Sequence, residues 1–218
     1  MASKRDWEPG LGAKLDARLA QVFRKCNDEE FCVMAHNNKS KASAPEYKDN
    51  GNPKYWEELL AQPEYANLKV NLSHFGGMDN KSGWREGIGG LMKRWPGVYA
   101  DIGDFTEITC EKARASFFKE LQAFFKKHES SPLLDRLMYG SDYFMDGLAP
   151  GYEAYAGNWI VSFQSHFAGN WRELAGGNAA NYLGLRSGKQ RTRLECFFKE
   201  NGLSPRWLDL VGQAPRTP

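Results

Sequence analysis

Hydrophobic positions along the chain alternate between a helical period and short continuous runs. Residues 14–26, KLDARLAQVFRKC, carry five apolar side chains at the spacing of one helix face. The next run, FCVMAH at 31–36, is short and continuous, as in a strand buried on both faces. The same patterns predict further strands at 68–74, 97–103 and 136–141, and helices at 52–62, 84–95, 111–128, 151–168 and 171–184. The tail after residue 185 is expected to add one helix and to dock through Trp207.

Strands that are separated by helices, with no hairpin signal between them, are typical of βα units and a parallel sheet. The predicted fold class is therefore α/β, with four parallel strands. Four strands are half of an eight-stranded barrel and cannot close one, so two sheet edges and one apolar face are expected to need cover. Three covers remain open: a complementing chain that supplies the other half, a second copy of this chain, or the N-terminal segment 1–13.

Composition mainly excludes classes of protein. Of the 218 residues, 41% are hydrophobic and 26% are charged, as in an ordinary soluble globular protein. The net charge of +2 is too small to argue for a nucleic acid or a membrane as partner, and the basic run at 186–193 is expected to be a solvated turn. The four cysteines form no CxxC pair, and the N-terminus has no apolar signal segment. These features favour a reduced, cytoplasmic protein.

Three of the predicted strands end on side chains that bind metals. FCVMAH ends on His36, LKVNLSH ends on His74, and RLMYGS is followed by Asp142. In parallel βα folds the carboxyl ends of the strands meet at one rim, so these side chains are expected to lie together. Histidine nitrogen and aspartate oxygen are ligands that zinc prefers, and a catalytic site keeps one position open for water. The pattern therefore predicts a divalent metal site, with zinc as the expected ion.

Each of these residues also has an ordinary structural explanation. A single histidine at a strand end is often held by a backbone carbonyl. Asp142 has the residue type of a helix cap or a turn, and Gly76–Gly77 suits a tight turn without being a phosphate loop. The metal interpretation depends on the three strand endings occurring together.

Several segments then resemble the metal-dependent amidohydrolase superfamily, in its amidohydrolase-related (amidohydrolase 2) branch of hydrolases and decarboxylases. The segments are CVMAHNNKS, NPKYWEELLAQPEYANLKVNLSHFGG, GVYADIGDF, LMYGSDYF and GGNAANYLGL, in this order, within about residues 14–185. The resemblance implies a (β/α)8 TIM barrel of which these strands are the fifth to eighth. The predicted domains are accordingly an N-terminal segment at 1–13, a half-barrel at 14–185 and a C-terminal helical extension at 186–218.

Carried over by position, His36 resembles the metal ligand of the family's fifth strand. His74 resembles the sixth-strand histidine, which binds a second metal or assists the catalytic water, and Asp142 resembles the eighth-strand aspartate, which accepts a proton from that water. The resemblance thus implies that His36, His74 and Asp142 hold the metal and that His74 and Asp142 are catalytic. The His-x-His pair of the family's first strand and its bridging Lys or Glu have no counterpart here, so the chain resembles a C-terminal half.

Two functions follow as alternatives. The first is a metal-dependent hydrolase, or a decarboxylase, that acts on a small carbonyl-containing substrate. The second is a non-catalytic half-barrel with an interaction or structural role. In the first case Lys39, beside Asn37 and Asn38, is a candidate contact for an anionic substrate, and Asp101 and Asp104 are candidates to orient the ligands, although a helix cap explains Asp104 equally well. Either function is expected to need a homo-oligomer or a complementing N-terminal half, with no nucleic acid and no membrane as partner.

Overall fold

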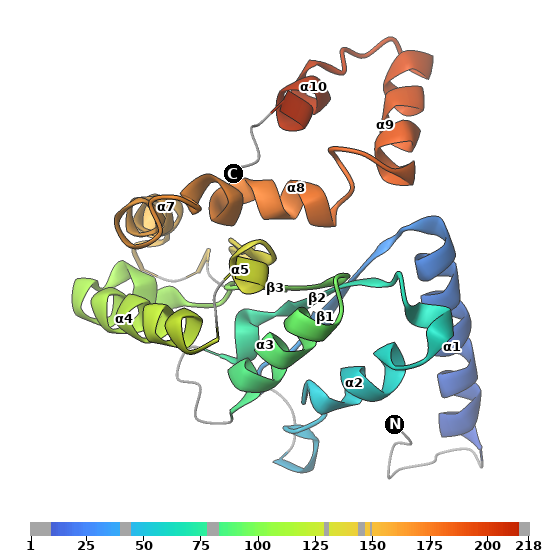
Figure 1. Ribbon diagram of the computed structural model, residues 1–218, viewed down its shortest axis with the longest axis horizontal. Coiled ribbons are helices and arrows are strands. Elements are labelled where there is room, and N and C mark those ends of the chain that lie inside the picture. Colours follow the sequence, from blue (N-terminus) through green and yellow to red (C-terminus); the bar gives the residue numbers. More distant parts are fainter. Residues whose placement is uncertain are drawn as a thin grey trace.

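A computed structural model describes residues 10–39, 45–77, 83–128, 131–143, 147–148 and 150–213. Figure 1 shows helices on both sides of a central sheet. The α-helices are α1 (Leu11–Glu29), α2 (Lys54–Leu60), α3 (Trp84–Arg94), α4 (Glu111–Lys127), α5 (Ser131–Leu134), α7 (Tyr155–His166), α8 (Asn178–Tyr182), α9 (Lys189–Glu200) and α10 (Arg206–Gln213). Shorter helical turns are η1 (Pro45–Tyr47), η2 (Pro63–Tyr65), η3 (His74–Gly76), η4 (Thr106–Thr109), η5 (Tyr152–Ala154) and the π-helical η6 (Glu173–Gly177).

The sheet contains β1 (Cys32–His36), β2 (Lys69–Ser73), β3 (Val98–Asp101) and β4 (Leu137–Met138), in that spatial order. Every neighbouring pair is parallel, so the predicted α/β fold with four parallel strands is confirmed. The strands are shorter than predicted. β2 ends at Ser73, so that His74 begins the turn η3 instead of ending the strand, and β4 has only two residues.

The two faces of the sheet differ in polarity because side chains alternate along each strand. One face carries Val70, Leu72, Val98, Ala100 and Leu137, which are all fully buried in the hydrophobic core. The helices α3 and α4 contribute the facing side chains of this core, namely Ile88, Leu91, Met92, Phe117, Phe118, Leu121, Phe124 and Phe125. The opposite face carries the polar Asn71, Ser73 and Asp101. The apolar face therefore anchors the sheet, and the polar face is available for chemistry.

The edge of the sheet at β4 is covered by the chain itself. The backbone carbonyls of Arg136 and Met138 accept hydrogen bonds from the β3 side. The backbone N–H and C=O groups of Leu137 and Tyr139 therefore point away from β3. There the Tyr139 N–H donates to the Leu174 carbonyl of η6 at 2.8 Å, and Asn178 Nδ2 donates to the Leu137 carbonyl at 2.8 Å. A carbonyl and a side-chain amide thus replace the missing neighbouring strand. This cover was not among the three predicted ones.

The β1 side of the sheet is more open. Of the predicted apolar face of α1, Phe23 packs edge-on against the rings of Trp56 and Tyr65. Leu15 and Val22 on the same helix are each 53% exposed, and Met34 of β1 is 71% exposed. Part of this apolar surface therefore lies in solvent, which is the liability expected of an unclosed half-barrel.

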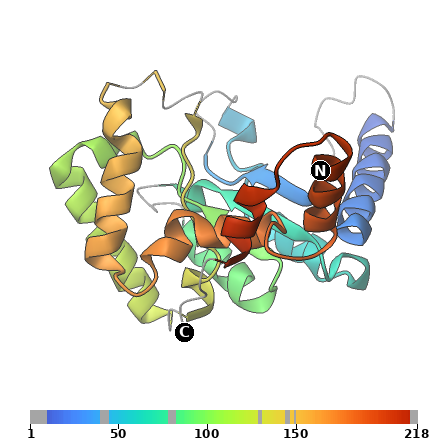
Figure 2. The ribbon, with the colours of Figure 1, turned by 90° about the horizontal axis from the view of Figure 1, so that it is seen from above.

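The C-terminal extension has two helices, α9 and α10, where one was predicted. Its buried anchor is Leu208, at 0% exposure, whereas the predicted anchor Trp207 is 42% exposed and contacts Phe198 within the extension. Figure 2 shows the extension beside α1, where Arg193 of α9 pairs with Glu29.

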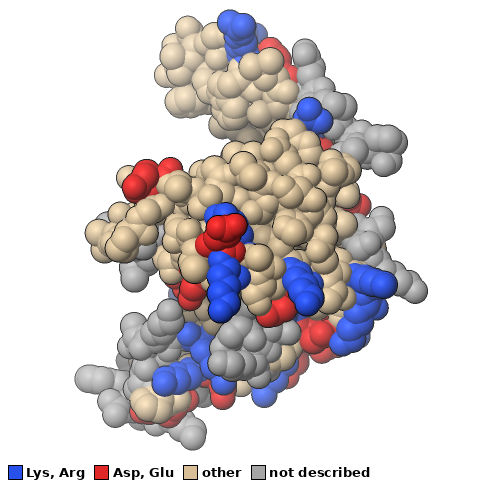
Figure 3. All heavy atoms as spheres, turned by 90° about the vertical axis from the view of Figure 1, so that its left-hand side faces the viewer, with Lys and Arg blue, Asp and Glu red and all other residues tan. Residues whose placement is uncertain are grey.

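The basic run at 186–193 is engaged within the chain, because Arg186 pairs with Glu173 and Arg191 pairs with Glu195 and Asp209. Lysine and arginine side chains lie next to acidic ones on the face shown in Figure 3 as well. Among the described residues, no helix combines the length and the apolar character that crossing a membrane requires.

Candidate metal centre

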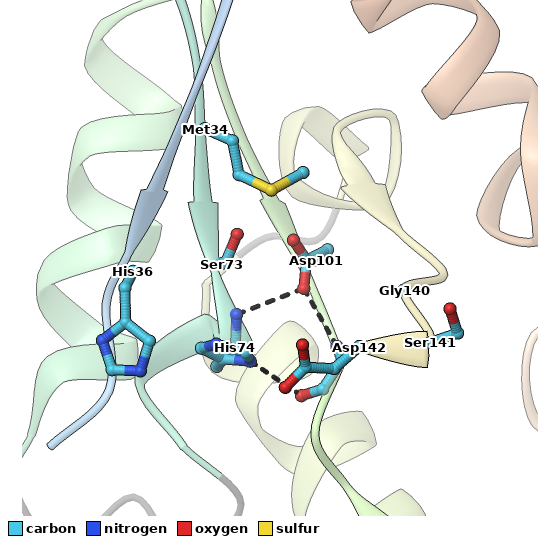
Figure 4. A pocket seen from close by; sticks show the side chains of 9 residues that line it. Met34, His36, Ser73, His74, Asp101, Gly140, Ser141 and Asp142 are labelled. Atoms are coloured by element: carbon cyan, nitrogen blue, oxygen red, sulfur yellow. Dashed lines mark hydrogen bonds between the residues drawn. The ribbon is translucent and has the colours of Figure 1, made fainter. Parts of the chain in front are cut away.

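A pocket of about 480 Å³ opens where the strands end at their carboxyl side. Figure 4 shows that His36, His74 and Asp142 come from successive parts of this rim, with His74 between the other two. The pocket is lined by Met34, His36, Ser73, His74, Asp101, Gly103, Gly140, Ser141 and Asp142. The structure thus brings the three predicted residues to one mouth. Whether they bind a metal stays a prediction.

His74 is held in an unusual backbone conformation. It follows β2 directly, has a φ of 70°, and is 8% exposed. Its Nδ1 lies 3.1 Å from the Gly103 carbonyl oxygen, which accepts hydrogen bonds and cannot donate them. Nδ1 therefore carries the ring hydrogen, and Nε2 of the neutral imidazole keeps its lone pair. This is the arrangement typical of a metal-binding histidine.

Two carboxylates approach His74. One ligand atom from each of His74, Asp104 and Asp142 lies within 4.8 Å of the other two. Asp104 and Asp142 have φ values of 59° and 43°, so all three residues occupy the left-handed region that non-glycine residues rarely adopt. Backbone strain of this kind clusters at functional sites, because ordinary packing gives no reason to maintain it. The coincidence of strain and proximity marks this rim as a site.

His36 lies beside this group. Its ring centroid is 4.8 Å from that of His74, and the two rings meet at 66°. The pKa of His36 lies below its ordinary value, first because the surrounding protein disfavours a charged ring and second because His74 adds like charge. Asp104 and Asp142 act in the opposite direction. A neutral imidazole is the form that ligates metals, so the lowered pKa favours ligation.

The residues present fit a divalent cation. They offer imidazole nitrogen and carboxylate oxygen, which suit zinc and also other first-row metals. Two carboxylates held this close repel each other unless positive charge lies between them. Within the described part of the chain, neither Asp104 nor Asp142 forms a salt bridge with a lysine or arginine. A bound cation would balance this charge.

Other residues of the loops around the rim lie outside the cluster. Asn37 is fully buried and its Nδ2 donates to the Gly51 carbonyl at 2.7 Å, which is a structural role. Lys39 pairs with Asp49 at 3.9 Å and does not line the pocket. Ser141 lines the pocket but points away from His74 and Asp142 in Figure 4. Tyr143 is 72% exposed.

The sequence assigned Asp104 no metal contact. A helix cap explained it equally well there, yet the turn that follows it, η4, has no side-chain capping bond. The signal was its position, since Asp104 comes shortly after β3 ends, as Asp142 does after β4. A second carboxylate at the same rim changes the donor set from two histidines and one aspartate to two of each.

Two comparisons with known proteins found a similarity. A family model described as "Amidohydrolase" matches residues 6–185. A crystal structure of an amidohydrolase from Burkholderia multivorans with bound HEPES is similar with a TM-score of 0.51 and 18% sequence identity. The similarity covers 76% of this chain and 57% of that one, so the chain spans little more than half of the solved protein. At this identity the likeness shows a shared fold, part of a barrel of βα units. No curated protein matches the sequence.

Proposed function

Since this chain belongs to the amidohydrolase family, we propose that it is a metal-dependent hydrolase that uses zinc or a similar divalent cation. The metal would be held by His36, His74 and Asp142, as the resemblance implied, with Asp104 as an additional carboxylate. One observation carries the proposal: His74, Asp104 and Asp142 converge within 4.8 Å, each in a strained left-handed conformation. The pocket of about 480 Å³ beside them has the size of a small-molecule site.

The roles of the protein's own groups follow from their positions. When bound, a divalent cation supplies Lewis-acid chemistry, in that it polarises a carbonyl and lowers the pKa of a water molecule. As the resemblance implies, a carboxylate oxygen of Asp142 would accept the proton that the attacking water loses. The Nδ1–H of His74 donates to the Gly103 carbonyl, so the ring is fixed in the tautomer that leaves Nε2 without a hydrogen. Partial desolvation lowers the pKa of the exposed His36 ring, which favours its neutral form.

Metal binding separates this proposal from a non-catalytic role. Titration of the purified chain with zinc should reveal about one tight site per chain, which is weakened strongly by Asp142→Asn and by His74→Ala. Matched controls are Asp49→Asn and His128→Gln, since Asp49 pairs with Lys39 and His128 with Glu86, both outside the cluster. A folded chain that binds no zinc at saturating concentration would instead support an interaction or structural role.

The choice of reaction needs a separate assay. The zinc-loaded chain should hydrolyse a small amide or ester, and the Asp142→Asn variant should lack this activity. Release of carbon dioxide from a carboxylated substrate, without hydrolysis, would favour the decarboxylase branch. Activity that persists in Asp142→Asn would contradict the proton-acceptor role.

The open β1 side has a place in this proposal. We propose that another chain with strands, either a second copy or a complementing N-terminal half, adds to β1 and closes the pocket beside His36. The exposed Met34 and the exposed side chains of α1 support this, and the self-covered β4 edge directs pairing to β1. Sedimentation of the pure chain distinguishes the cases: a dimer favours a second copy, and a stable, zinc-binding monomer with full activity would contradict both.

A further inference from the structure

We propose that Asp101 is the positioning residue of the candidate metal centre: its buried carboxylate fixes the backbone and the ring of His74 and the loop that carries Asp104. The assignment rests on the proposed metal-dependent function and extends it to a residue outside the ligand set. Asp101 ends β3 and is 7% exposed. It points toward the polar face of the sheet, between the residues that it would organise, as Figure 4 shows.

Three hydrogen bonds engage both oxygens of this carboxylate. Oδ1 accepts from the His74 backbone N–H at 3.2 Å and from the Gly103 backbone N–H at 2.9 Å. Oδ2 accepts from Nδ2 of Asn71, which lies on the neighbouring strand β2, at 2.6 Å. A carboxylate accepts only, so the amide nitrogen of Asn71 must face it. Asp101 is therefore bonded to the end of β2 and to the loop after β3 at the same time.

These bonds form a closed path through His74. Asp101 Oδ1 holds the N–H of Gly103, and the carbonyl of the same Gly103 accepts from His74 Nδ1. The His74 N–H returns to Asp101 Oδ1, so backbone and imidazole are fixed from one point. A φ of 70° costs a non-glycine residue free energy, and the bond to Asp101 offsets part of that cost.

The same carboxylate touches the two loops that supply the other ligand candidates. Gly103 directly precedes Asp104, so the hydrogen bond from the Gly103 N–H to Asp101 fixes the position of the backbone at Asp104. Gly140 lies two residues before Asp142, and a Cβ at this glycine would come within 2.9 Å of Asp101 Oδ1. Asp101 is thus packed against all three loops of the cluster, while Asp101 itself is not among the residues grouped as ligands.

Asp101→Asn tests the assignment with little change in shape. The new amide oxygen still accepts from the two backbone N–H groups, but the new NH₂ group faces Asn71 Nδ2, donor against donor. Turning the Asn71 amide over would relieve this contact but break the bond of Nδ2 to Ser73 Oγ. Loss of such an orienting partner typically weakens metal binding by about 10- to 100-fold, and we expect zinc affinity to fall in this range. The His74 and Gly103 amide hydrogens should also exchange faster with solvent.

The double variant Asp101→Asn/Asn71→Asp provides the rescue. It places the acceptor on β2 and the donor on β3, which restores the hydrogen bond and the local charge in reversed order. We expect it to recover most of the lost zinc affinity and of the amide protection, because the two sites are directly coupled. A general loss of stability would lower the free energy of unfolding without changing the zinc affinity of the folded chain, so urea denaturation without zinc separates it from a loss of positioning. Asp49→Asn, which removes an exposed carboxylate, is the control for charge alone.

The outcomes separate the two proposals. The positioning role would be overturned if Asp101→Asn bound zinc as tightly as the wild type, or if the double variant bound it no more tightly than the single one. Either result would leave the proposed metal site intact. A wild-type chain that binds no zinc would overturn the proposed function and this assignment with it. If Asp101→Asn does not fold, Asn71→Ala leaves the carboxylate of Asp101 in place and removes the hydrogen bonds of Asn71 Nδ2 to Asp101 and to Ser73 Oγ, and zinc affinity should then fall roughly fivefold. An unchanged affinity in Asn71→Ala would likewise overturn the assignment.

Discussion

Gly76→Ala perturbs the turn that carries His74 away from β2. Gly76 has a φ of 78°, which is left-handed, and it passes very close to the start of α3. A Cβ at this position would lie 2.5 Å from the Arg85 backbone nitrogen and 2.9 Å from the Trp84 carbonyl carbon. Real Cβ atoms do not approach backbone this closely, so either the turn or α3 must move.

The cost follows from two effects. A non-glycine residue in the left-handed region costs about 1–2 kcal/mol. Steric overlap that forces backbone shifts in a packed region costs a further 1–3 kcal/mol or so. Because the contacting atoms are backbone, rotation of a side chain cannot relieve the overlap. The free energy of unfolding should therefore fall by about 2–5 kcal/mol, a large part of the 5–15 kcal/mol typical of a domain.

Urea denaturation at fixed pH measures this change, with the midpoint and the slope fitted separately. Gly90→Ala is the matched control, because Gly90 lies inside α3 with nothing within 4 Å of its Cβ position. Alanine is favoured over glycine inside a helix by about 1 kcal/mol, so this variant should be more stable than the wild type. The same substitution is thus expected to change the free energy of unfolding in opposite directions at two positions that lie fourteen residues apart.

A Gly76→Ala protein as stable as the wild type would refute this reasoning. The turn would then have room for a side chain, and the left-handed conformations of His74 and Phe75 beside it would lose their support. A destabilised variant that still binds zinc with unchanged affinity would have a different meaning. It would show that the turn contributes to stability without placing the His74 ring.

Three further predictions concern other parts of the fold. Asn178→Ala removes both donors to the Leu134 and Leu137 carbonyls and should lower the free energy of unfolding by about 1–3 kcal/mol in urea melts, unless water replaces the amide. Folding lowers the pKa of His36 from 6.5, so the unfolded chain binds a proton at higher pH than the folded chain does. The free energy of unfolding should therefore fall as the pH drops below about 6.5, and it should fall less steeply in His36→Asn. Arg191→Ala loses its bonds to the Leu208 carbonyl and to Asp209, so amide exchange should quicken in α10 while the sheet stays protected.

The sequence predicted the order and direction of the elements well. Continuous apolar runs identified the strands, and the Phe-rich face of residues 111–128 became the buried face of α4. The expectation that residues 31–36 form a strand buried on both faces was wrong, because Met34 and His36 on one face of β1 are exposed. Periodicity could not reveal how the β4 edge is covered. That cover depends on one side-chain amide, Asn178, and on the carbonyl of Leu174, which lie far from β4 along the chain.

The site was predicted in part, for a related reason. His36, His74 and Asp142 could be named because each lies at or shortly after the carboxyl end of a strand, and parallel strands bring these ends together. Asp101 and Asp104 are separated by two residues, yet the first accepts three neutral donors and the second joins the cluster. Residue type and spacing do not distinguish a carboxylate saturated by N–H groups from one left open to a cation.

Backbone strain explains why that distinction is built into the fold. Five non-glycine residues in the described ranges have left-handed φ values, and three of them are His74, Asp104 and Asp142. Each such residue costs of order 1–3 kcal/mol, so their combined cost is comparable to the stability of a small domain. The packed Phe face of α4 and the saturated carboxylate of Asp101 stabilise the structure enough to hold these conformations. Three strained residues of ligand type at one rim therefore support the proposed metal site.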